Sequence, residues 1–101
     1  MVAVVALAAC FPKSGPTPGP VSPEEVKAAA VKWPGVTEPQ LAEGRQLFIE
    51  RCNSCHGYPD VNAKEEGEWP SIMDRMAKKA KLDAGQKTRV LHFILASRSP
   101  Q

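Results

Sequence analysis

Four stretches of the chain have features of helices, the last three with apolar residues at helical spacing, and no stretch alternates apolar and polar positions as a half-exposed strand would. The first, SPEEVKAAAVKW, begins with Ser22 as a candidate N-cap and ends before Pro34 and Gly35, which stop helices. The second, TEPQLAEGRQLFIERC, begins with Thr37 as N-cap. The third is EWPSIMDRMAKKA, and the fourth is DAGQKTRVLHFILASR. The pattern predicts an all-α fold of about four short helices.

Each of the last three predicted helices carries a stripe of residues suited to a core. Glycine inside a helix costs about 1 kcal/mol relative to alanine, so Gly44 in the second stripe indicates close approach by another backbone, the alternative being an accidental glycine. Asp83 and Gln86 have capping-box spacing at the start of the fourth helix. The predicted stripes of the last three helices are Leu41, Gly44, Leu47 and Phe48; Trp69, Ile72, Met73, Met76, Ala77 and Ala80; and Val90, Leu91, Phe93 and Ile94.

The first ten residues, MVAVVALAAC, are apolar but too few to span a bilayer, which needs about 20. They fit the apolar core of a signal peptide. The ending LAAC resembles a bacterial lipobox, in which the cysteine, here Cys10, is lipidated; the alternative is a plain signal peptide in which Cys10 is incidental. The sequence FPKSGPTPGP follows without periodicity, and residues 11–22 could reach about 35 Å at about 3.1 Å per residue. We expect a signal peptide at 1–9, a lipid-anchored proline-rich tether at 10–22 and one domain at 23–98.

Composition narrows the function classes. The 101 residues carry a net charge of +2, which is too small to indicate a nucleic-acid partner. Charge is uneven, with nine acidic and five basic residues at 22–68 but two acidic and seven basic residues at 74–98. A basic end of this kind is either a solvated face or a docking surface. The folded part is small enough that a disulfide, a metal or a cofactor is a common supplement to its core.

The segment ERCNSCHGYPD holds the strongest chemical signal, Cys52, Cys55 and His56 in the order Cys-x-x-Cys-His. A thioredoxin-like dithiol needs a parallel sheet, which this pattern does not predict. A structural zinc site needs four ligands, and outside the motif only Cys10 and His92 remain. Covalent attachment of haem c needs this spacing, because two thiols add across the two vinyl groups and the adjacent histidine becomes an axial ligand of the iron. Export agrees with this third interpretation, which the sequence favours.

Gly44-x-x-x-Phe48, followed by the motif and Gly57, resembles the first helix and haem site of class I c-type cytochromes. The segment VLHFIL resembles their last helix, which crosses the first helix near its glycine and aromatic residue. The resemblance covers about residues 37–97, and WPSIMDRMA is similar to a bacterial monohaem subgroup in which a tryptophan precedes the ligating methionine. It implies a small class I cytochrome c-like fold wrapped around one covalently bound haem c. It also implies that the carbonyl of Pro59 accepts a hydrogen bond from His56.

The second axial position has three candidates, Met73, Met76 and His92. His92 shares its helical side with polar and small residues, which predicts a solvent-facing side chain. Met76 lies near the middle of the apolar stripe and matches the methionine of the subgroup, so we expect Met76 as the distal ligand, with Met73 as the alternative. Trp69, Tyr58 and Phe48 are expected in the haem pocket or core.

These features predict a monohaem electron-transfer protein, not an enzyme, that passes one electron between redox partner proteins of unknown identity. We expect it on the periplasmic side of a bacterial membrane, held through Cys10, with the outer membrane favoured over the inner. One alternative is an open-site haem protein that binds a gas or acts on peroxide, although the sequence offers no clear distal acid–base pair. Another is an assembly subunit in which haem only fills the core.

Overall fold

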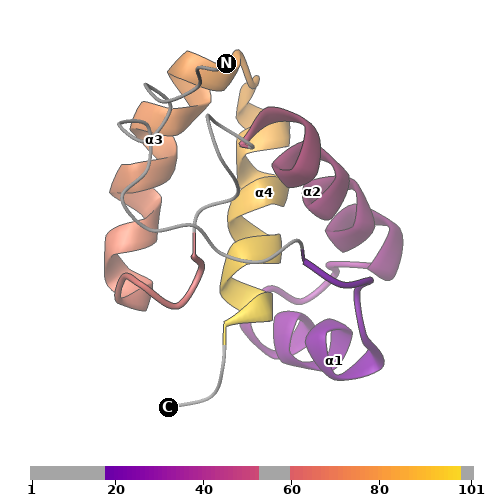
Figure 1. Ribbon diagram of the computed structural model, residues 1–101. Helices are drawn as coiled ribbons and strands as arrows, with labels where there is room; N and C mark the ends of the chain where they lie inside the picture. The colour runs from indigo at the N-terminus through magenta and orange to yellow at the C-terminus, as the bar shows by residue number, and fades with distance from the viewer. Residues whose placement is uncertain (1–17, 53–59, 99–101) are drawn as a thin grey trace, which may run out of the picture.

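The computed structural model describes residues 18–52 and 60–98, and this part of the chain is helical, without strands. Its elements are α1 (Pro23–Lys32), α2 (Glu38–Arg51), the short 3-10 helix η2 (Glu66–Glu68), α3 (Trp69–Ala80) and α4 (Ala84–Ser97). In Figure 1, α4 runs through the middle of the molecule between α3 and α2, and α1 lies below α2. The prediction of an all-α fold with four short helices is confirmed for the described residues.

The helices begin where the capping pattern predicts. Ser22 and Glu25 form a reciprocal capping box at α1, in which the Ser22 hydroxyl accepts from the Glu25 N–H at 3.1 Å. Thr37 caps α2 in the same way, and the Asp83 carboxylate accepts from the Gln86 N–H at 2.8 Å at the start of α4. Each box satisfies N–H groups that lack partners in the first helical turn.

The backbones of α2 and α4 pack closely together at Gly44. A Cβ atom at Gly44 would lie 2.1 Å from the carbonyl oxygen of Arg89 and 3.0 Å from the Cβ of Phe93. One turn further along α2, the rings of Phe48 and Phe93 meet with their centroids 5.6 Å apart. The predicted backbone approach at Gly44 is confirmed, and its partner is the helix that the resemblance indicates.

The core lies where α2, α3 and α4 converge. Ile72, Met76 and Leu91, which the pattern assigned to apolar stripes, are only partly buried against it. The buried members of this core cluster are Leu47, Phe48, Cys52, Trp69, Met73, Val90, Phe93 and Ile94. Cys52 is thus the motif residue that the structure describes, and its side chain is part of the core.

Among the described residues, none of the helices has the length and apolar character needed to cross a bilayer. Within the expected tether, residues 18–22 are described, and they lie against the domain. The preceding residues, including Cys10 and the expected signal peptide, lie outside the described part.

Candidate haem site

The structure describes part of the predicted site. Cys52, Met73 and Met76 are described, whereas Cys55 and His56 lie outside the described residues. The same holds for Tyr58 and Pro59, and for the lipidation candidate Cys10. The roles assigned to these undescribed residues therefore stay predictions.

Cys52 caps the C-terminus of α2, where its N–H donates to the Phe48 carbonyl at 3.0 Å. Its side chain is a free thiol and the residue is 4% exposed. Burial raises the pKa of the Cys52 thiol to about 11, because a thiolate would lose its hydration in the apolar core. The site therefore favours a neutral sulfur group at this position.

Arg51 fixes the end of α2 against the end of α3. Its guanidinium Nη1 donates to the carbonyl oxygens of Ala80 and Lys81, at 3.1 and 3.4 Å. These carbonyls belong to the last turn of α3, where helical acceptors lack intrahelical partners. Because Cys52 follows Arg51 directly, the first cysteine of the motif lies at the same end of the molecule as the C-terminal half of α3.

The two candidate methionines differ in burial. Met73 is fully buried and belongs to the core cluster with Cys52 and Trp69. Met76, about one turn later, is partly buried and packs against the same cluster. Both sulfur-bearing side chains therefore lie on the side of α3 that faces the cluster, and their exposure alone does not select one as a ligand.

The described donors suit a haem attached through cysteine. A thioether at Cys52 would be neutral and would fit the apolar cluster, and a methionine sulfur lies in that cluster already. Among the described residues, no group of three or more cysteine, histidine or acidic side chains is placed to hold a metal ion.

Two donors converge on the carbonyl of Val61, shortly after the motif. The indole Nε1 of Trp69 and the Nε of Arg98 each donate to this oxygen at 3.2 Å. Arg98 also donates to the Lys64 carbonyl at 3.0 Å. Trp69 was expected in the pocket or core, and it is 2% exposed. Sequence reasoning did not assign Arg98, because a single arginine at the end of a basic helix gives no signal for a distant carbonyl.

His92 is half-buried, whereas the helical pattern predicted a solvent-facing side chain. Its ring stacks on Trp33, just after α1, with centroids 4.0 Å apart and planes 18° apart. Burial in this stack lowers the pKa of His92. The spacing within α4 does not show that α1 and Trp33 cover this side of the helix. Among the described residues, His92 therefore packs on Trp33. The competing candidate for the second axial position, Met73, lies in the core cluster instead.

Exposed cations gather at the C-terminal end of α3. Among the described residues, none of these four side chains has a carboxylate partner within ion-pair distance: Arg75, Lys78, Lys79 and Lys81. Lys87 at the start of α4 pairs with Asp74 at 2.9 Å, and this hydrogen bond and charge lower the pKa of Asp74. The basic residues of the sequence thus cluster at the C-terminal end of α3. Arg51, the residue before Cys52, donates to carbonyls at this same end.

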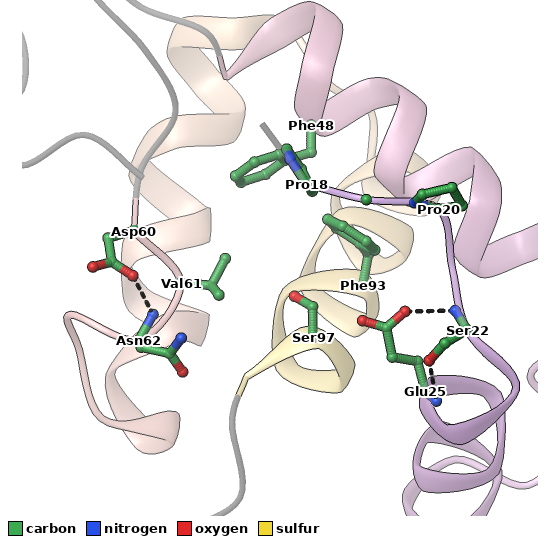
Figure 2. A pocket seen from close by; sticks show the side chains of 11 residues that line it. Pro18, Pro20, Ser22, Glu25, Phe48, Asp60, Val61, Asn62, Phe93 and Ser97 are labelled. Atoms are coloured by element: carbon green, nitrogen blue, oxygen red, sulfur yellow. Dashed lines mark hydrogen bonds between the residues drawn. The ribbon is translucent and has the colours of Figure 1, made fainter. Parts of the chain in front are cut away.

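A cavity of about 320 Å³ lies beside the aromatic pair of α2 and α4. Its walls include Phe48 and Phe93, together with Val61 from the opposite side, as Figure 2 shows. Pro18 and Pro20 from the expected tether line the same cavity. Sequence reasoning missed this contact, since proline-rich composition carries no periodic signal.

Comparisons with models of protein families, with curated proteins and with solved structures found no match to this chain.

Proposed function

We propose that the chain is a monohaem c-type cytochrome that carries one electron between redox partner proteins outside the cytoplasm. The observation that carries the proposal is the position of Cys52 at the end of α2, buried in one cluster with Met73, against which Met76 packs. The motif order supplies the other thiol, Cys55, and the axial histidine, His56. The Gly44 crossing of α2 and α4 supports the same family, because the resemblance places a glycine and an aromatic residue at this crossing.

In this proposal Cys52 and Cys55 would hold the haem through thioethers, and His56 and Met76 would ligate its iron, with Met73 as the alternative to Met76. The carbonyl of Pro59 would orient the His56 ring by accepting its second N–H. The haem would supply one-electron chemistry between its ferric and ferrous states. The residues of the core cluster exclude water and so disfavour the extra charge of the ferric state.

The protein acts as a carrier and not as an enzyme, because two protein ligands leave no open coordination site for a substrate. The basic end of α3 favours partners with an acidic face, since opposite charges speed encounter between redox proteins. Lipidation at Cys10 would keep the carrier on the periplasmic side of a bacterial membrane, and we favour the outer membrane. Nucleic acid is not a proposed partner.

The visible spectrum of the purified protein, oxidised and reduced, tests this function. We expect a low-spin haem c spectrum, a weak red band of a methionine–iron bond in the oxidised form, and no carbon monoxide binding after reduction. Ready carbon monoxide binding by the unmutated protein would support the open-site alternative. Failure of an exogenous donor to reduce the haem reversibly would instead support a structural role for it.

A further inference from the structure

The proline-rich segment does not leave the domain at Ser22. The guanidinium of Arg45 on α2 donates from Nε to the Gly19 carbonyl at 2.8 Å and from Nη2 to the Pro18 carbonyl at 3.0 Å. Two successive carbonyls are thus held by one planar group, whose rigid fork suits paired acceptors. Among the described residues Arg45 has no carboxylate within ion-pair distance, so these carbonyls are its described polar partners.

The rest of the segment is held as well. Val21 packs against the core cluster, and the Ser22 N–H donates to the Glu25 carboxylate at 2.8 Å. Pro18 and Pro20 line the cavity beside the Phe48 and Phe93 rings (Figure 2). Proline has no backbone N–H, so these two positions can lie over an apolar surface without burying an unpaired donor.

Arg45 makes the contact that the helix cap cannot make. The capping box of α1 fixes Ser22, but Pro18 lies four residues earlier and no capping interaction reaches it. We propose that residues 18–22 form a strap, a segment that packs on the folded domain as part of it. The hydrogen bonds from Arg45 to this strap fix the point at which the N-terminal segment leaves the domain. The exit point is then on α2, next to the crossing with α4.

The strap has a consequence for an anchored protein, and this consequence rests on the lipid anchor of the proposed function. A tether that ran freely to Ser22 would reach about 35 Å, whereas a tether that ended at residue 17 would reach at most about 22 Å at about 3.1 Å per residue. The domain is therefore held closer to the membrane, and its exit point restricts how it can turn. The strap limits the set of faces that the carrier presents to the bilayer.

The first test measures backbone motion in the full chain by nitrogen-15 relaxation at Gly19, Val21 and Ser22. We expect order parameters near about 0.85 in the unmutated protein and below about 0.6 at Gly19 and Val21 in Arg45→Met. Arg51→Met is the matched control, since Arg51 also donates to two carbonyls but at the end of α3. It should leave the strap rigid. Arg45→Lys is a second variant, which keeps the positive charge but loses the planar guanidinium that donates to both carbonyls.

High order parameters in both Arg45→Met and the unmutated protein would overturn the role of Arg45. Low order parameters in both proteins would overturn the strap itself. The second test places the lipidated chain in phosphatidylethanolamine and phosphatidylglycerol nanodiscs with spin-labelled headgroups. Amide broadening should be confined to one face in the unmutated protein and spread evenly in Arg45→Met. Even broadening in both overturns the restricted orientation. A missing haem spectrum or acyl mass would refute the proposed function instead, because the order parameters report only on the contact between Arg45 and residues 18–22.

Discussion

Replacing Gly44 by alanine tests the crossing on which the site is built. The new Cβ would lie 2.1 Å from the Arg89 carbonyl oxygen and 2.7 Å from its carbon, whereas ordinary contact begins at about 3.4 Å. These are backbone atoms of α4, so the clash cannot be relieved by turning a side chain. The two helices would have to separate by more than 1 Å along this direction, which would also loosen the contact between the Phe48 and Phe93 rings.

The expected magnitude follows from two opposing effects. Alanine gains about 1 kcal/mol of helix propensity over glycine. Overpacking a tight core costs about 1–3 kcal/mol and occasionally more, and contact with helix backbone places Gly44→Ala at the upper end. We expect a net loss of about 2 kcal/mol or more in the free energy of unfolding. For a domain of this size that corresponds to a fall of about 10 °C in Tm.

Guanidinium chloride unfolding of the haem-loaded protein measures this loss, and Gly85→Ala provides the matched control. Gly85 is also helical, in α4, but its added Cβ would meet the Asp83 carboxylate at an ordinary 3.5 Å. This variant should be neutral or gain up to about 1 kcal/mol. If Gly44→Ala proves as stable as Gly85→Ala, α2 and α4 do not cross at Gly44 and the geometry given above is wrong.

Three further outcomes are expected. Met76→Ala should lose the methionine–iron band, bind carbon monoxide when reduced and lower the potential, whereas Met73→Ala should keep these features and lose about 2–5 kcal/mol of stability from its fully buried site; the opposite result would make Met73 the ligand. Proton NMR titration should give His92 a pKa below 6.5 that rises in Trp33→Ala, and its contribution to stability, present above pH 6.5, should be lost as the pH falls below that value; an unchanged pKa in Trp33→Ala would contradict burial in the stack as the cause. Cys10→Ser should release the protein from membranes, and recovery of the unmutated protein in solution without detergent would refute lipidation.

Local chemistry made the helices predictable from the sequence. Ser22, Thr37 and Asp83 satisfy N–H groups within their own first turns, so each cap can be read from neighbouring residues. Gly44 was informative because a glycine that weakens a helix calls for a packing reason, and the structure supplies one in the Arg89 carbonyl. The resemblance indicated only that the last helix crosses there, and the Arg89 carbonyl itself was found in the structure.

Contacts between distant segments were not predictable from local pattern. Arg45 reaches the Pro18 and Gly19 carbonyls across 26 or more positions, and any backbone carbonyl presents the same acceptor. The stack of Trp33 on His92 likewise depends on where α1 packs, which the weak apolar pattern of that helix does not specify. At the site, burial of Cys52 with Met73 was found only in the structure, and Cys55 and His56 stay predictions from the motif.

The central claim is covalent attachment of one haem through Cys52 and Cys55, and the intact mass of the purified protein tests it most directly. The protein should be expressed with a full export signal in cells that attach haem c. We predict the mass of the processed chain raised by one haem, with the colour retained by the polypeptide in acidified acetone and lost in Cys52→Ala with Cys55→Ala. An unmodified chain, or haem that passes into the acetone, would contradict the claim.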